Sequence, residues 1–189
     1  MKLTVMYLGF TLSSGTIASI LSGCRADDSI DWLPKFFSSE EVNFLDALAE
    51  TILPKTHTPG AKDAMVTRFI DTVRPLRFSE DDNNVFKQDL GLFIRQAKEE
   101  NKQEFIRLSS EKRHDWVMAV DAASYKLLET DTEPQSEARP FYLALKEMIL
   151  AGYFSSEIVA KHYFEYDPVP GRYDPCISYE DIGRAWALG

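Results

Sequence analysis

The stretch SSEEVNFLDALAETILP, residues 38–54, decides the fold class of this 189-residue chain. Ser38 and Glu41 form the capping-box pattern of a helix start, in which each side chain accepts the other residue's backbone N–H. Apolar residues then recur three or four positions apart, at Val42, Leu45, Leu48, Ala49 and Ile52. Pro54 cannot continue a helix, because it lacks an N–H and its ring clashes with the preceding turn. The stretch therefore predicts an amphipathic α-helix.

The same periodicity runs through most of the remaining chain, and no alternating pattern long enough for a sheet occurs. We expect further helices from Met65 to Pro75, from Ser79 with Val85 inside, from about Ser109 to Glu129, from about Arg139 to Tyr153, after Ser155 or Ser156, and from Ser178 to near Trp186. The sequence predicts one all-α domain over residues 38–189. We expect this domain to be a helical bundle of about six to seven helices with a Pro/Tyr-rich C-terminal strap.

The N-terminus predicts a lipoprotein. Residues 3–23 carry no charge, follow Lys2, and end in Leu21-Ser22-Gly23-Cys24. This predicts a signal peptide over 1–23, acylation of Cys24, and a tether over 24–37. A spanning helix is the alternative, since about 20 apolar residues can cross a bilayer. The Ser, Thr and Gly content and the position of Cys24 favour the lipoprotein. We expect a periplasmic or cell-envelope protein, lipid-anchored to a membrane through Cys24.

Composition narrows the function classes. The chain has 30 acidic and 21 basic residues, for a formal net charge of −9. Such an acidic protein repels the phosphate backbone of nucleic acids, so we expect no nucleic-acid partner. Apart from Cys24, Cys176 is the only cysteine. We expect it to be buried, because free cysteine is among the most buried residue types.

Motifs for catalysis and cofactor binding are absent. The sequence has no glycine-rich dinucleotide loop, no Cys-x-x-Cys-His haem motif, no His-Glu-x-x-His and no Gly-x-Ser-x-Gly. His162 and Glu165 are three positions apart, and Glu157 is near, but no further ligand has matching spacing. We therefore expect no catalytic, cofactor-binding or metal residue in this chain. An alternative function is that of a hydrolase whose catalytic pair consists of two carboxylates on its helices.

Two segments, residues 50–71 and residues 141–176, contain residues that a plain helical bundle does not need. In the second, six aromatic residues crowd around Pro168, Pro170 and Gly171. One interpretation is a strap packed over the bundle. The other is a preorganised docking surface, because aromatic residues on rigid loops are favoured at protein interfaces. The residues alone favour neither.

Motifs in these segments resemble those of the gluconate 2-dehydrogenase subunit 3 family. They are Thr51-Ile52-Leu53-Pro54, Thr58-Pro59-Gly60-Ala61, Phe69-Ile70-Asp71, Gly152-Tyr153-Phe154-Ser155-Ser156-Glu157 and Tyr166-Asp167-Pro168-Val169-Pro170-Gly171-Arg172-Tyr173. The similarity spans roughly residues 38–186. One departure is the N-terminus, where only Lys2 stands in place of the family's frequent twin arginines. We expect either general secretory export or a true start upstream of Met1.

The resemblance implies a non-catalytic accessory subunit of a periplasmic sugar or sugar-acid dehydrogenase. It would bind a large glucose–methanol–choline type flavoprotein, help its export and assembly, and tether it to the membrane. FAD and haem would belong to partner subunits, the haem to a multihaem cytochrome c. The candidate partner-binding residues are Pro59, Gly60, Tyr153, Phe154, Glu157, Tyr166, Pro168, Pro170, Gly171 and Tyr173. A free-standing carbohydrate-binding lipoprotein that uses the Tyr-rich strap is the alternative.

Overall fold

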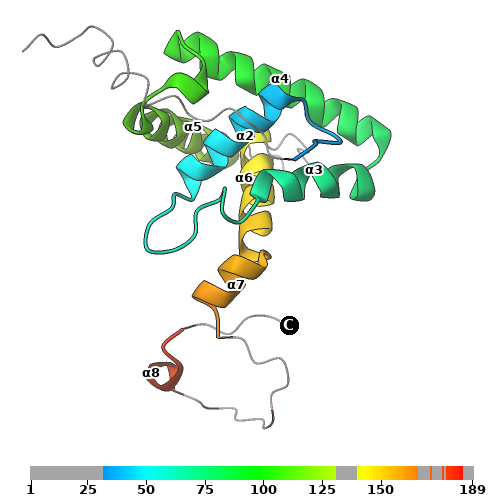
Figure 1. Ribbon diagram of the computed structural model, residues 1–189. Helices are drawn as coiled ribbons and strands as arrows, with labels where there is room; N and C mark the ends of the chain where they lie inside the picture. Colours follow the sequence, from blue (N-terminus) through cyan, green and yellow to red (C-terminus); the bar gives the residue numbers. More distant parts are fainter. Residues whose placement is uncertain (1–31, 131–139, 166–170, 172–175, 177, 185–189) are drawn as a thin grey trace, which may run out of the picture.

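The computed structural model describes residues 32–130, 140–165, 171, 176 and 178–184, and all its long elements are helices (Figure 1). They are α2 (Ser39–Ile52), α3 (Val66–Arg77), α4 (Glu80–Asn101), the short 3₁₀-helix η2 (Phe105–Arg107), α5 (Ser110–Thr130), α6 (Phe141–Phe154), α7 (Glu157–Tyr163) and α8 (Tyr179–Ile182). The predicted all-α fold is confirmed.

Helix starts follow local capping chemistry. Ser38 and Glu41 cap α2 reciprocally, and Ser79 forms the same box with Asp82 at the start of α4. Ser156 caps α7 by accepting the backbone N–H of Val159. These side chains satisfy N–H groups that have no partner within the helix, which is why the starts are readable from sequence.

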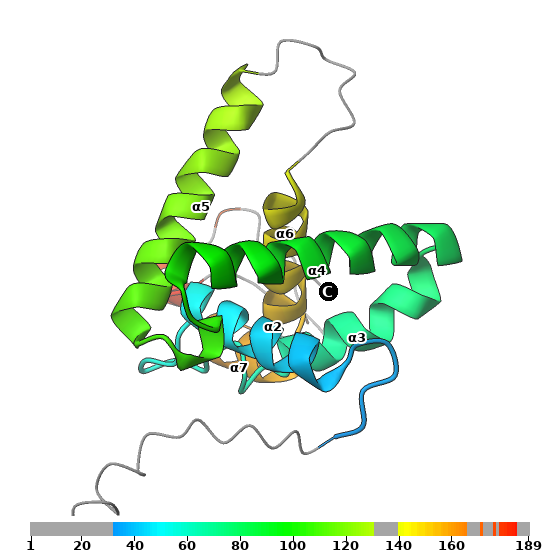
Figure 2. The ribbon, with the colours of Figure 1, turned by 90° about the horizontal axis from the view of Figure 1, so that it is seen from above.

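Helix α2 lies in the middle of the bundle and packs against α3, α5 and η2, while α6 packs against both α3 and α5. Helix α4 crosses over α6, and α5 runs outward from the body (Figure 2). Phe93 on α4 is the centre of the aromatic core. Its ring centroid lies 5.3–5.9 Å from those of Phe44, Trp116, Phe141 and Tyr142. The core therefore joins α2, α4, α5 and α6.

Helix α3 continues past Pro75 to Arg77, so the prediction that Pro75 ends it was wrong. The proline costs one hydrogen bond in the last turn. That turn is closed by the Phe78 N–H, which donates to the Arg74 carbonyl at 3.2 Å. The Arg74 guanidinium lies 4.0 Å and 4.2 Å from the ring centroids of Phe78 and Phe86. These contacts hold the turn in place.

Three further expectations were wrong. The last helix ends at Ile182 rather than near Trp186, and Gly183 follows it with a positive φ that favours glycine. Val85 lies on the exposed side of α4. Cys176 is exposed. No helix in the described residues is both long and apolar enough to span a bilayer.

Candidate functional site

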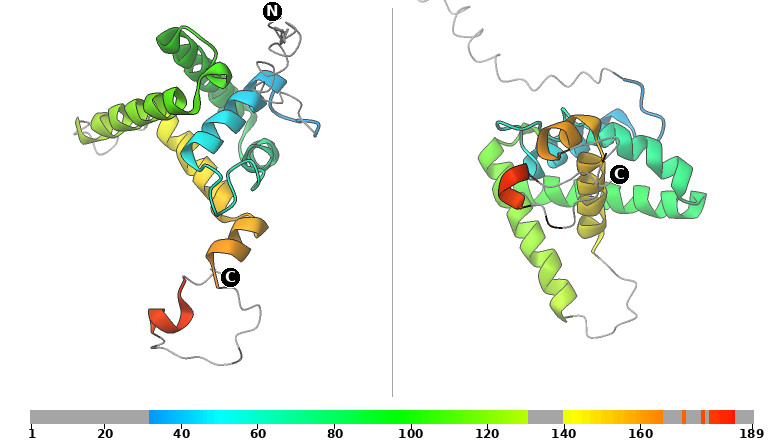
Figure 3. Two further views of the ribbon diagram at one scale, coloured as in Figure 1. Left: turned by 60° about the vertical axis from the view of Figure 1, so that its left-hand side comes forward. Right: turned by 90° about the horizontal axis from the view of Figure 1, so that it is seen from below.

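The loop that joins α2 to α3, residues 53–65, is held by hydrogen bonds within itself and to three helices. It packs against the C-terminal end of α6 and contacts the last residue of α7, Tyr163 (Figure 3, left). Within it, the Ala61 N–H donates to the Leu53 carbonyl at 2.9 Å. The Thr56 N–H donates to the Thr58 carbonyl at 3.1 Å. We call this segment the Pro59 loop.

Glu50, in the last turn of α2, closes the Pro59 loop from inside. Its Oε1 accepts the Lys55 N–H at 2.9 Å, and its Oε2 accepts the Lys62 N–H at 3.0 Å. Gly60 lies against this carboxylate. A Cβ atom there would be 2.4 Å from Glu50 Oε1 and 2.7 Å from the Lys55 nitrogen. The loop therefore needs glycine at position 60 for space, not for an unusual φ angle.

Two tyrosines lock the loop to α6 and α7. The Tyr153 hydroxyl of α6 donates to the Pro59 carbonyl at 2.7 Å. The Tyr163 hydroxyl of α7 donates to Thr58 Oγ1, also at 2.7 Å. Tyr153 is only 2% exposed, and burial raises the pKa of its phenol. Its ring therefore positions the loop and offers almost no surface to a ligand.

Asp63 adds an ionic tie within the loop. Its carboxylate accepts the Gly60 N–H at 3.1 Å and pairs with Lys55 at 3.0 Å. The Gly60 N–H and the Lys55 ammonium lower the pKa of Asp63 below its usual 3.8. Asp63 is thus charged at neutral pH. Like Glu50, it stabilises the loop by accepting a backbone N–H.

Beside the locked loop lies an aromatic and apolar surface. Phe154 is 46% exposed and stacks edge-on against Tyr153, with ring centroids 5.2 Å apart. Ile158 on α7 is also exposed. Gly152 lets α6 approach α3 closely, since a Cβ there would lie 2.8 Å from Phe69. The surface is therefore built on tightly packed helix ends.

The structure brings together four of the sequence-predicted residues, Pro59, Gly60, Tyr153 and Phe154, in the Pro59 loop and its contacts. Glu157 lies on the exposed side of α7 and pairs with Lys161. Gly171 is exposed, and a Cβ there would meet no described atom within 4 Å. The other predicted residues lie outside the described residues: Cys24, Tyr166, Pro168, Pro170 and Tyr173.

Sequence reasoning missed Glu50 and Asp71. Asp71 of α3 is 1% exposed, and its carboxylate accepts the backbone N–H groups of Lys35, Phe36 and Phe37 at 2.8–2.9 Å. It therefore clamps residues 35–37, the end of the predicted tether, onto α3. The signal was present in the matched motif Phe69-Ile70-Asp71. Its chemistry depends on backbone more than 30 positions away.

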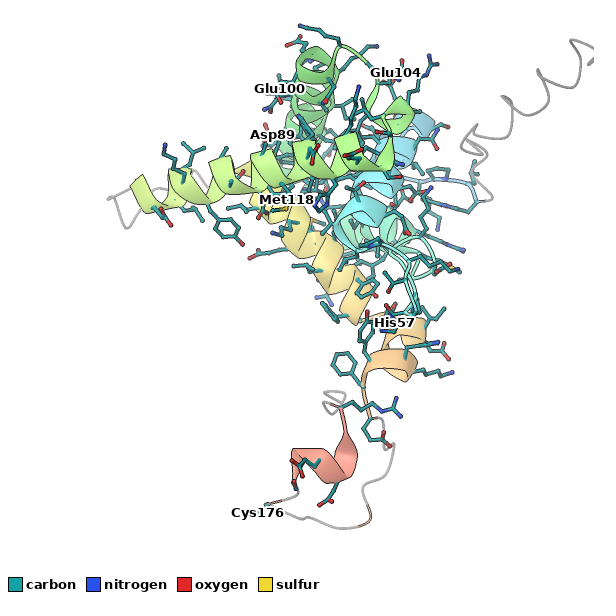
Figure 4. The ribbon with its side chains drawn as sticks, turned by 90° about the vertical axis from the view of Figure 1, so that its left-hand side faces the viewer. His57, Asp89, Glu100, Glu104, Met118 and Cys176 are labelled. Atoms are coloured by element: carbon teal, nitrogen blue, oxygen red, sulfur yellow. The ribbon has the colours of Figure 1, made fainter. Side chains whose placement is uncertain are left out.

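His57 and His162 lie on the Pro59 loop and on α7, respectively. His57 lies near α7 (Figure 4). The Nδ1 of His162 lies 2.8 Å from the Ile158 carbonyl of its own helix. Glu165 pairs with Arg184 rather than with His162. Within the described ranges, no three His, Cys, Asp or Glu side chains are placed to hold a metal ion.

These features define a small all-helical protein with a surface loop held by hydrogen bonds from α2, α6 and α7. The family model of gluconate 2-dehydrogenase subunit 3 matches residues 39–171, which include α2 to α7 and the whole Pro59 loop. The chain belongs to the gluconate 2-dehydrogenase subunit 3 family. Searches of curated proteins and of solved structures found no match.

Proposed function

We propose that this protein is the accessory subunit of a flavin-dependent sugar or sugar-acid dehydrogenase. It binds the large flavoprotein, helps its export and assembly, and holds the complex at a membrane through acylated Cys24. FAD belongs to the large subunit in this proposal, and haem to a multihaem cytochrome c subunit. Membership of the family supports a place in such a complex.

The Pro59 loop is the observation that carries the proposal. Its motif residues come from segments about a hundred positions apart, and they meet in one rigid surface. A loop that is already ordered loses little conformational entropy when a partner docks, so more of the contact energy appears as affinity. Exposed Phe154 and Ile158 beside the loop supply the aromatic and apolar contact area that protein interfaces favour.

Co-purification from membranes tests this proposal. A tagged chain should retain a flavoprotein, identified by its flavin absorbance and by mass spectrometry. The double variant Phe154→Ala/Ile158→Ala should lose most of that flavoprotein while its helical content is unchanged. Leu92→Ala is the matched control, because Leu92 is 55% exposed on α4 and distant from the Pro59 loop in sequence.

A tagged chain that recovers no oxidoreductase from membranes would overturn the proposed function. Equal loss of flavoprotein in the double variant and in Leu92→Ala would instead overturn the assignment of the Pro59 loop and its neighbours as the docking surface.

A further inference from the structure

Helix α3 has a second apolar face, on the side away from the core. Its inner side buries Val66, Ile70 and Arg74. Its outer side exposes Thr72 and Leu76, four positions apart on one helical face. Phe69 lies at the edge of this face, 36% exposed, with its ring packed against Gly152 of α6. Leu76 is 76% exposed, and Met65 at the N-cap is 60% exposed. A surface helix normally shows polar residues on its outer side, so this face needs a partner.

The charge of this face is opposite to that of the protein. Between Met65 and Phe78 the exposed charged residues are two arginines. Arg68 lies beside the apolar face, and Arg77 is exposed in the last turn, on the side of Ile70 and Arg74. The single acidic residue in this range, Asp71, is buried and bound to three backbone N–H groups. The chain as a whole has 30 acidic and 21 basic residues. Apolar residues flanked by arginine are the pattern of helices that lie on anionic membranes.

The Asp71 clamp connects this face to the N-terminal segment. Lys35, Phe36 and Phe37 are fixed to α3 through the Asp71 carboxylate. Cys24 precedes Lys35 by eleven positions. Even fully extended, that length of chain spans only about 40 Å. An acyl anchor at Cys24 would therefore keep α3 within about 40 Å of the bilayer surface.

We propose that the outer face of α3 lies on the anionic headgroups of the membrane that holds the anchor. The inference rests on the proposed acylation of Cys24. Two arginines and a short apolar face bind a membrane only weakly by themselves. The anchor makes the contact intramolecular, with an effective concentration on the order of millimolar, which lets a weak contact persist. The contact fixes the orientation of the domain and leaves the Pro59 loop to bind the partner.

The test measures how close α3 lies to lipid. The full chain carries Cys176→Ser, which removes the exposed thiol, and Thr72→Cys, labelled with a fluorophore and reconstituted in vesicles. Phosphatidylcholine vesicles that contain phosphatidylglycerol and a headgroup quencher should quench the Thr72 probe, whereas pure phosphatidylcholine vesicles should not. A probe at Gln88→Cys on the exposed side of α4 is the positional control and should stay unquenched.

Charge variants separate contact from mere proximity. Arg68→Gln/Arg77→Gln should weaken the contact by about fivefold for each arginine removed. Arg95→Gln/Lys112→Gln removes the same charge from exposed positions of α4 and α5 and should change nothing. An unquenched Thr72 probe, equal quenching at Gln88, or indifference to the arginine variants would overturn the proposal. Protection of Thr72 only when the flavoprotein is added would overturn it in favour of a subunit interface. Mass spectrometry of the N-terminal peptide reports acylation separately, so failure of the anchor is distinguishable.

Discussion

At the scale of single residues, Gly60 has the strictest packing requirement in the Pro59 loop. Gly60→Ala forces the added Cβ against the Glu50 carboxylate and the Lys55 nitrogen. We expect it to lower the free energy of unfolding by about 1–3 kcal/mol, the usual range for a steric change of this kind. Urea denaturation followed by circular dichroism measures this.

Gly91 provides the matched control. It lies inside α4, and a Cβ there would have no neighbour within 4 Å. Gly91→Ala should therefore stabilise the protein by about 0.5–1 kcal/mol, because alanine loses less backbone entropy than glycine in a helix. If both substitutions had the same sign, the packing role of Gly60 would be refuted.

Asp63 predicts a pH dependence of loop stability. Its pKa is lowered in the folded state, so its contribution is fully present above the ordinary value of 3.8 and disappears as the pH falls through the lower folded pKa. Asp63→Asn should therefore destabilise the protein at neutral pH and have little effect in strong acid. Urea midpoints of both proteins across this pH range provide the measurement. A difference that is independent of pH would contradict the assigned role.

At the scale of elements, Asp71 holds the N-terminal segment on α3. Asp71→Asn keeps one acceptor oxygen but loses the charge and places amide donors among three N–H groups. We expect a loss of about 1.5–3 kcal/mol and faster tryptic cleavage after Lys35, with helix content retained. Asp89→Asn, on the middle of α4, is the control and should leave cleavage unchanged. Resistance of the Asp71 variant to trypsin would show that other contacts hold the segment.

Element starts were predictable from sequence because their causes are local. The Ser38–Glu41 and Ser79–Asp82 boxes lie within four residues of chain. The end of α3 was not predictable, because Arg74 stabilises the turn after Pro75 by packing on Phe86, which belongs to α4. For the site, motif resemblance found Pro59, Gly60 and Tyr153. It missed Glu50, since nothing local distinguishes one organising carboxylate among 30 acidic residues.

At the scale of the whole molecule, Phe93 joins the helices into one core. Phe93→Ala removes a 6%-exposed ring that contacts aromatic side chains from α2, α5 and α6. We expect a loss of about 3–5 kcal/mol in a single cooperative transition. Thermal unfolding, followed by both near- and far-UV circular dichroism, measures this. The adjacent substitution Leu92→Ala should have an effect within about 0.5 kcal/mol, because Leu92 is mostly exposed. Separate transitions for secondary and tertiary signals would argue against one core.

The locks on the Pro59 loop also set the order in which its surface can be completed. Tyr153 and Tyr163 bind loop residues 94 and 105 positions earlier in the chain. Synthesis begins at the N-terminus, so the loop is made long before either tyrosine. During that interval only short-range ties, such as Glu50 with Lys55 and Lys62, can shape it. A truncated chain that ends before α6 would present an unfinished loop. The surface can therefore be complete only after α6 and α7 have been synthesised.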